Sequence, residues 1–335
     1  MSLTSIQPKR QRLQRSELAV PATSLRFFDK ARQSAADFVF LDLEDAVAPA
    51  QKREAREIAI AALNEIEWGN KTMAVRVNGL DTEWGIRDII EVVTRCPRLD
   101  LVLVPKVGTA RDVQFVDALI TGLEGESGRT DRLGIEVLIE TTLGLAHVEE
   151  IAASSDRLEA MIFGVGDYSI DLQTCGEVIG ASDPRYVMLT DPDAAGVRHT
   201  HWNDQWHFAL SRIANACRAY RLRAIDGPYA NFGDAAGLRA AAERAVALGF
   251  EGKWAIHPSQ IETANEVFSP TAKQVRWAQE ILAAIESANA GGAGAFGKDG
   301  VLIDMAVAKI AQAVCDRHEL IARATGEAGG DRNAA

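Results

Sequence analysis

The stretch FVFLDLED, from Phe38 to Asp45, joins a run of large apolar residues to three acids at its end. A near-continuous apolar run is typical of a strand that is buried on both faces, as in a parallel sheet. Seven more runs of this kind recur along the chain. The eight predicted strands are Leu18–Pro21, Phe38–Leu43, Met73–Val77, Leu101–Val104, Ile135–Ile139, Ala160–Val165, Leu222–Ile225 and Lys253–Ile256.

The segments between these runs carry helical periodicity, for example at Lys52–Leu63, Arg87–Val93 and Ala236–Leu248. Eight strands that alternate with helices predict an α/β fold, specifically a (β/α)8 TIM barrel, and 335 residues are enough for one. A doubly wound open sheet is the alternative. No G-x-G-x-x-G motif follows the first strand, which disfavours that alternative.

Two regions depart from the alternation of strands and helices. The polar segment 173–206 follows the sixth strand, so we expect it above the barrel mouth, ahead of a helix at about Phe208–Ala219. A Gly/Ala-rich segment, 291–300, precedes Val301–Ala322, which has the pattern of one more helix. We therefore predict a barrel over residues 1–290, and a hinge, a C-terminal helix and a disordered tail over 291–335.

The net charge of −11 argues against a nucleic-acid partner, which requires a basic surface. No apolar run is long enough to cross a membrane, and the N-terminal residues lack the apolar core of a signal peptide. The four cysteines are scattered, as expected for free thiols in a reducing compartment. We expect a cytoplasmic enzyme that acts on small molecules.

Polar residues follow most of the predicted strands at the point where each strand ends. In a TIM barrel these ends meet at one rim, which carries the active site. Burying so many charges is costly unless they are used or paired. The residues concerned are Asp42, Glu44, Asp45, Arg76, Asn78, Lys106, Glu140, Asp167, Asp226 and His257.

Glu140 and Asp167 follow adjacent strands, so their carboxylates can lie close together. Two close carboxylates repel each other unless a cation lies between them. Hard oxygen ligands without a His or Cys cluster indicate Mg²⁺, with Mn²⁺ possible. The alternative is that each acid pairs separately with an Arg or Lys of the barrel.

Arg76 can serve in two ways. A fixed guanidinium near a metal can hold a substrate carboxylate through two hydrogen bonds. It can equally form a salt bridge to Glu44 or Asp45, and both can hold at once. For His257, in AIHPSQ, we favour a structural or backbone contact over proton transfer because Pro258 indicates a turn.

Several ordered motifs together resemble the citrate lyase β-subunit and HpcH/HpaI aldolase superfamily, over about Arg15 to Asp304. The long insert, with VMLTDPDAAG and THWNDQW, is most similar to the L-malyl-CoA/β-methylmalyl-CoA lyase branch. The motifs are FLDLEDAV (Phe40–Val47), VRVNGLDT (Val75–Thr82), VPKVG (Val104–Gly108), IET (Ile139–Thr141), FGVGDY (Phe163–Tyr168) and GKWAIHPSQ (Gly252–Gln260).

This resemblance implies a Mg²⁺-dependent, reversible Claisen cleavage of malyl-CoA, or its β-methyl variant, to acetyl-CoA, or propionyl-CoA, and glyoxylate. It implies that Glu140 and Asp167 hold the metal and that Arg76 binds the substrate carboxylate. Gly166 and Asp167 would bind glyoxylate through their N–H groups. Glu44 and Asp45 are expected to be catalytic together with Arg76, and Ile256 and His257 are expected to bind substrate.

The resemblance also gives the extra C-terminal helix a role. It would form a lid over a neighbouring subunit's site, and its Asp304 would move the proton at the carbon next to the thioester. A homo-oligomer, a trimer or hexamer, follows from that arrangement. By itself, Asp304 would be taken for a solvent-facing helical residue.

The expected CoA contacts lie in Ala19–Lys30, with Ala19, Ser24 and Lys30 at the matching positions. This loop departs from the family pattern, because Ala22 replaces a glycine and Ser24 stands where some relatives have arginine. Asp171, in GDYSID, is an acid added near the mouth. Two alternatives remain open: a thioesterase or lyase of the same superfamily acting on malyl-CoA or citramalyl-CoA, and a non-catalytic CoA-binding paralogue.

Overall fold

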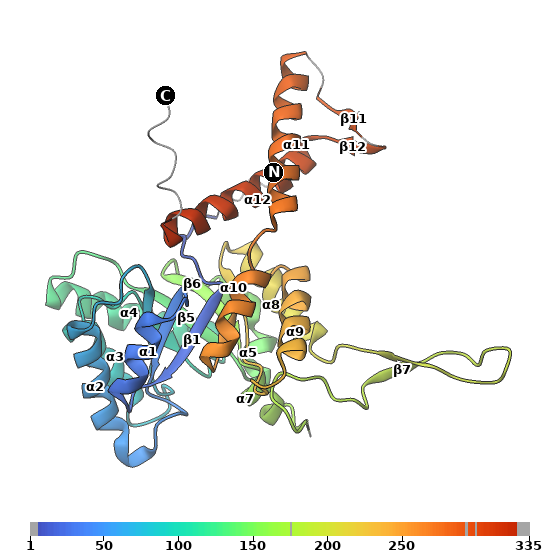
Figure 1. Cartoon of the computed structure of the whole chain (residues 1–335). Coiled ribbons are helices and arrows are strands. Elements are labelled where there is room, and N and C mark those ends of the chain that lie inside the picture. Colours follow the sequence, from blue (N-terminus) through green and yellow to red (C-terminus); the bar gives the residue numbers. More distant parts are fainter. Residues whose placement is uncertain (1–5, 175, 292–293, 299, 327–335) are drawn as a thin grey trace. The chain divides into compact units, whose positions relative to one another are not determined.

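The computed structural model describes residues 6–174, 176–291, 294–298 and 300–326, and it contains a closed barrel of eight parallel strands (Figure 1). Going round the barrel, the order is β1-β10-β9-β6-β5-β4-β3-β2, which confirms the predicted fold. The barrel strands are β1 Ser16–Pro21, β2 Phe38–Asp42, β3 Thr72–Arg76, β4 Leu101–Val104, β5 Gly134–Ile139, β6 Leu158–Phe163, β9 Arg223–Asp226 and β10 Gly252–Ala255.

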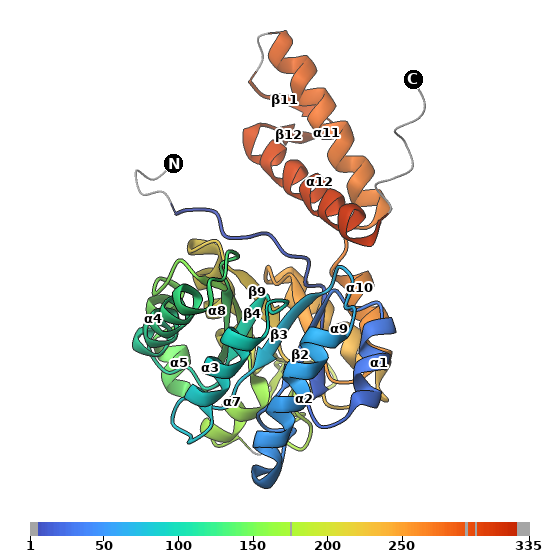
Figure 2. The same cartoon turned by 90° about the vertical axis from the view of Figure 1, so that its left-hand side faces the viewer.

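Helices surround the strands, as Figure 2 shows for α1, α2 and α3. Short 3-10 turns, η1 (Pro49–Gln51) and η2 (Pro258–Gln260), precede two of them. The helices up to the end of the barrel are α1 Leu25–Gln33, α2 Lys52–Glu65, α3 Gly85–Arg95, α4 Ala110–Ser127, α5 Thr142–Ala146, α6 Val148–Ala152, α7 Val165–Asp171, α8 His207–Ala219, α9 Ala235–Ala247 and α10 Ile261–Val267.

An apolar cluster fills the middle of the barrel and determines which side chains reach its mouth. Its members include Phe40 on β2, Ala74 on β3 and Leu138 on β5. Alternate residues of a strand face the same side, so the residues two positions later point into the barrel as well. Those residues are Asp42, Arg76 and Glu140.

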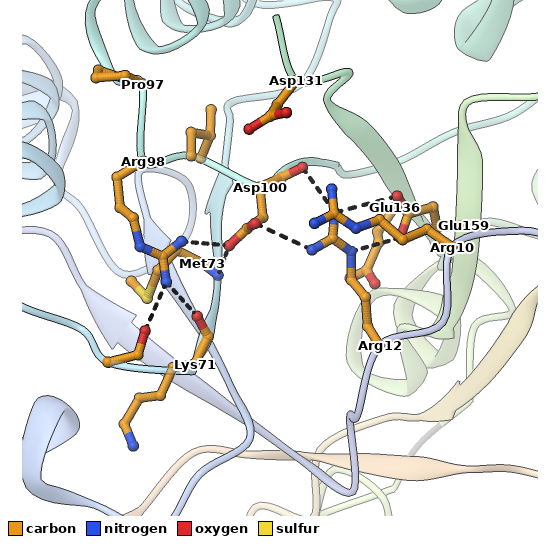
Figure 3. Close-up of polar contacts among 12 residues, drawn as sticks. Arg10, Arg12, Lys71, Met73, Pro97, Arg98, Asp100, Asp131, Glu136 and Glu159 are labelled. Carbon is orange, nitrogen blue, oxygen red and sulfur yellow. Dashed lines mark hydrogen bonds and ion pairs between the residues drawn. The ribbon is translucent and has the colours of Figure 1, made fainter. Parts of the chain in front are cut away.

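At the amino end of the barrel, ion pairs replace apolar side chains. Arg223 donates to Glu136 at 2.9 Å, and Arg12 donates to Glu159 at 2.8 Å. Arg12 also reaches Asp100 at 3.2 Å, which Figure 3 shows between Arg12 and Arg98. Glu136 is fully buried, so this end of the barrel is closed to solvent. Its Arg223 and Arg12 are paired, whereas Oε1 of the equally buried Glu17 has no hydrogen-bond partner among the described residues.

The chain divides into two compact units, Met1–Asn265 and Glu266–Ala335, whereas the sequence placed the boundary at 290/291. The second unit contains α11 (Ala272–Ala290), a hairpin of β11 (Phe296–Lys298) and β12 (Val301–Ile303), and α12 (Met305–Thr325). Residues of both helices and of β12 share one apolar cluster. The packing of α11 against α12 therefore assigns α11 to the second unit.

Three sequence expectations are corrected. The Gly/Ala-rich segment holds β11, and α12 begins at Met305 rather than Val301, because β12 and the cap Asp304 precede it. Val165 belongs to α7 rather than to the sixth strand. The predicted disordered tail lies, from residue 327 on, outside the described residues.

The insert 173–206 carries a two-stranded hairpin of β7 (Val187–Leu189) and β8 (Thr200–Trp202) that extends away from the barrel (Figure 1). All six strand residues are exposed. In the described ranges, no helix combines the length and apolarity needed to cross a bilayer.

Candidate active site

Arg76, at the end of β3, is the buried centre of the site. Its Nε and Nη2 donate to the two carboxylate oxygens of Asp42 at 2.8 and 2.7 Å. The register of the parallel strands β2 and β3 places Asp42 opposite Arg76. The Arg76 guanidinium also lies over the rings of Trp254 and Phe40, 5.2 and 5.9 Å from their centroids.

The third nitrogen of Arg76 faces the acids that follow β2. Nη1 lies 2.9 Å from Oε2 of Glu44 and 3.4 Å from Oδ2 of Asp45. Burial works against the charge of Arg76, but the carboxylates of Asp42, Glu44 and Asp45 together outweigh it and raise the pKa of the guanidinium. The salt bridge that the sequence considered is therefore present, and Asp42 contributes a stronger, two-bond contact that the sequence did not predict.

Lys106, just after β4, connects Glu44 to the proposed metal ligands. Its Nζ donates to Glu44 at 2.6 Å and lies 3.3 Å from Oδ2 of Asp167. Its backbone has φ of 53°, a left-handed conformation that residues with a side chain seldom adopt. The backbone N–H donates to Oε1 of Glu140 at 2.8 Å. Lys106 thus contacts the carboxylates of both Glu140 and Asp167.

Glu140 is buried directly after β5. Burial, together with the negative charges of Glu44 and Asp167, raises the pKa of Glu140 to about 8, although Arg76 acts in the opposite direction. Close packing fixes its position, since a Cβ at Gly164 would lie 2.3 Å from the Glu140 Cβ and 2.5 Å from Oε2. Glycine at position 164 leaves room for this carboxylate.

Asp167 lies in the first turn of α7 rather than at a strand end. Its Oδ2 is buried and accepts no hydrogen bond from the described residues. The pKa shift of Glu140, this carboxylate oxygen, whose charged neighbour is the Lys106 ammonium at 3.3 Å, and the oxygen-only donor set all fit a hard divalent cation. No group of three or more His, Cys, Asp or Glu in the described chain is arranged to hold a metal. Glu140 and Asp167 would supply two ligands and leave other positions for substrate oxygens and water.

The expected CoA-binding residues lie near the carboxyl end of β1 and on α1. Ala19 packs against the apolar cluster inside the barrel. Ser24 is the N-cap residue of α1, without a side-chain cap bond, and Lys30 is exposed in the last turn. These three positions face different surroundings, and their contact with CoA stays a prediction.

The other expected substrate-binding residues lie in two segments, helix α7 and the residues that follow β10. Gly166 is the second residue of α7. Ile256 follows β10 and is exposed, and His257 next to it caps η2 by accepting from the N–H of Ser259 at 3.2 Å. The His257 ring stacks on Phe232 with centroids 4.8 Å apart. This geometry gives His257 a structural contact of the kind that we favoured.

Asp304 belongs to the second unit, where it is the N-cap of α12. Its Oδ1 accepts from the N–H groups of Ala306 at 2.9 Å and Val307 at 3.2 Å. Its catalytic role stays a prediction. The sequence placed Asp42 among the strand-end acids but gave it no role, and it considered only Glu44 and Asp45 as partners of Arg76.

Residues 15–258 match the model of the HpcH/HpaI aldolase/citrate lyase family. The chain is 45% identical over 321 residues to an L-malyl-CoA/beta-methylmalyl-CoA lyase of Rhodobacter capsulatus, with 96% of this chain and 99% of that protein covered. It is 35% identical to a (3S)-malyl-CoA thioesterase of Cereibacter sphaeroides, with 87% and 89% covered. A solved structure of CitE from Mycobacterium tuberculosis in complex with magnesium, acetoacetate and coenzyme A is similar, with a TM-score of 0.69, 27% identity and coverage of 92% and 98%.

Proposed function

The chain belongs to the HpcH/HpaI aldolase/citrate lyase family, and we propose that it is a Mg²⁺-dependent carbon–carbon lyase. Its reaction would be the reversible Claisen cleavage of L-malyl-CoA or β-methylmalyl-CoA to glyoxylate and acetyl-CoA or propionyl-CoA. The single observation that carries this proposal is the pair of the buried Glu140 and the partly buried Asp167 beside Arg76 and Lys106. The near full-length similarity to an L-malyl-CoA/beta-methylmalyl-CoA lyase supports it.

Mg²⁺ on Glu140 and Asp167 would act as a Lewis acid toward the oxygen that gains charge as the C–C bond breaks or forms. Arg76 would orient the carboxylate of the small oxoacid. Asp42 accepts one N–H from each of Nε and Nη2, and Nη1 faces Glu44 and Asp45, so the second N–H of Nη2 is the contact that Arg76 would offer to this carboxylate, rather than a two-bond clamp. Glu44 and Asp45 hold Nη1 in place.

We further propose that Asp304 of one subunit moves the proton at the carbon next to the thioester in a neighbouring subunit's site. In this arrangement α12 acts as the lid, and the enzyme is a homo-oligomer, a trimer or hexamer. The CoA moiety would be bound by Ala19, Ser24 and Lys30, and glyoxylate by Gly166 and Asp167, with Ile256 and His257 beside them. We place the enzyme in the cytoplasm, consistent with the free thiols of Cys96, Cys217 and Cys315.

The alternatives are weaker. The thioesterase relative is less similar and covers less of the chain than the lyase relative. A non-catalytic paralogue would have no need of the charged pair and of Arg76, whose burial is costly.

The test is an activity matrix of short acyl-CoA thioesters against 2-oxoacids, with Mg²⁺ or with EDTA. We expect condensation of acetyl-CoA or propionyl-CoA with glyoxylate, only in the presence of Mg²⁺. Glu140→Gln and Asp167→Asn should each abolish it while far-UV circular dichroism stays unchanged. No condensation with any pair would refute the lyase, and release of free CoA from malyl-CoA without glyoxylate would favour the thioesterase.

A further inference from the structure

We propose that Asp171 and Thr142 form a tether that sets the separation of Glu140 and Asp167, so that Asp171 is a positioning residue for the metal pair. The inference rests on the proposed metal site and adds to it a residue that touches neither the metal nor the substrate. It concerns α7 and the start of α5, the two segments that follow β6 and β5.

The contact consists of two short hydrogen bonds to one oxygen. Oδ2 of Asp171 accepts from the backbone N–H of Thr142 at 2.5 Å and from its Oγ1 hydroxyl at 2.6 Å. Thr142 is the first residue of α5, so its N–H has no acceptor within the helix and is free for this bond. These bonds lower the pKa of Asp171, which therefore stays ionised and forms the stronger, charge-assisted kind of hydrogen bond.

The tether joins the two segments at a defined distance from the metal pair. Thr142 lies two residues after Glu140, and Asp171 lies four residues after Asp167, on the same face of α7. A shift of α7 along or away from α5 would therefore move Asp167 relative to Glu140. Holding Asp171 on Thr142 opposes that shift.

The same two segments are also joined at their base. The N–H of Gly164 donates to the carbonyl of Ile139 at 3.1 Å, and the missing Cβ of Gly164 lets β6 end against Glu140. Along the chain, Glu140 and Asp167 thus lie between a backbone bond at the base and the Asp171–Thr142 bond at the tip. Two attachments fix a spacing that one attachment would leave free to vary.

The tether is not needed for the fold. Asp171 is exposed, whereas α7 is anchored by Tyr168, whose ring packs edge-on against Phe163 at 5.4 Å and Trp206 at 6.4 Å. Thr141 caps α5 independently by accepting from Gly144 at 2.9 Å. Loss of the tether should therefore change the metal site and leave the barrel intact.

The experiment measures Mn²⁺ binding to the full-length protein by electron paramagnetic resonance, which counts free Mn²⁺ without any turnover. Thr142→Val removes the hydroxyl bond and keeps the backbone bond, and it should weaken binding about threefold to tenfold, the range expected for one hydrogen bond. Asp171→Ala removes both bonds and should weaken binding at least as much. Asp171→Asn keeps the acceptor oxygen and Thr142→Ser keeps the hydroxyl, so both should bind nearly as the wild type does. The double variant Asp171→Ala/Thr142→Val should be no weaker than the weaker single variant.

The other possible outcomes refute either the tether alone or the metal site together with the tether. If Asp171→Asn loses as much affinity as Asp171→Ala while Thr142→Val is unchanged, only the charge of Asp171 matters and the tether is refuted. Unchanged binding by Asp171→Ala and Thr142→Val, with binding abolished by Glu140→Gln and Asp167→Asn, refutes the tether but keeps the metal site. Wild-type binding by Glu140→Gln and Asp167→Asn refutes the metal site and the tether with it. Should Asp171→Ala fail to fold, Thr142→Val and Thr142→Ser decide.

Discussion

At the scale of single residues, Arg76 and the acids that contact it form one buried set of charges, and each member depends on the others for its partner. One guanidinium contacts Asp42, Glu44 and Asp45, and Lys106 supplies a second cation to Glu44. Removing one member of such a buried set leaves the others with an unpaired charge, which costs more than the original pair contributed. The stability of the site thus depends on the presence of every member of this set rather than on any one ion pair.

Arg76→Met should lower the free energy of unfolding by about 3–5 kcal/mol, because Asp42 and Glu44 would remain buried without their partner. Urea unfolding followed by circular dichroism measures the change. The matched control is Arg95→Met, which breaks an exposed pair with Glu57 at 2.8 Å and should cost at most about 1 kcal/mol. Equal losses in the two variants would contradict the argument.

Glu140 predicts a pH dependence with a defined sign. Its pKa is about 8 in the folded protein against 4.5 as the reference, so the folded state binds the extra proton between these values. The stability that this proton provides is fully present below about pH 4.5 and is lost as the pH rises through about 8. A cation stabilises the ionised form, so Mg²⁺ should restore that loss.

In thermal unfolding, the midpoint in Mg²⁺ minus the midpoint in EDTA should therefore increase between about pH 6 and about pH 9. Glu140→Gln has no proton to lose at this position and should show a small, pH-independent difference. A wild-type difference that decreases toward high pH would contradict the assignment.

Much of the site follows from strand periodicity alone. The apolar runs predict where strands end, and alternation puts Asp42, Arg76 and Glu140 on the inside, so the sequence predicted the ring of charges. It could not predict that Asp42 rather than Glu44 takes two bonds of Arg76, because that choice depends on the register between strands. The contact between Asp171 and Thr142 depends on how two loops meet, which no local pattern encodes.

At the scale of elements, the barrel strands were predictable because their burial on both faces leaves an uninterrupted apolar signal. The residues at which one element ends and the next begins were harder to predict. VGDYSID begins with an apolar residue that reads as strand, yet helix α7 starts at Val165. VLI, residues 301–303, fits a helix or a strand by composition, and its pairing with Phe296–Lys298 decides for the strand.

The cap at the start of α12 allows the structural and catalytic roles of Asp304 to be separated. Asp304→Asn keeps a good N-cap and should leave the unfolding midpoint unchanged, whereas Asp304→Ala should cost about 0.5–2 kcal/mol. Both should stop hydrogen exchange at the α-carbon of acetyl-CoA, followed by NMR in deuterated water, while glyoxylate binding persists. Full exchange in Asp304→Asn would remove Asp304 from the chemistry.

At the scale of the whole molecule, the chain comprises a barrel and a second unit with its own apolar cluster. If α12 of one subunit covers a neighbour's site, two differently inactivated chains can repair each other. Hybrid oligomers of Glu140→Gln and Asp304→Asn contain some sites in which both residues are intact. Co-expression with two different tags, followed by tandem purification, should therefore recover lyase activity that neither variant has alone. No recovery in verified hybrids would mean that each lid serves its own chain.

The ion pairs around Arg223 and Glu136 close the interior of the barrel at its amino end, so the site opens to solvent only at the mouth. In the proposed mechanism, a small oxoacid at Glu140 and Asp167 would leave only through the mouth, where the bulkier thioester would bind over it. In a site with a single opening, the ligand that binds last must dissociate first. We therefore expect the acyl-CoA product to depart before glyoxylate, and in the direction of synthesis the oxoacid to enter first.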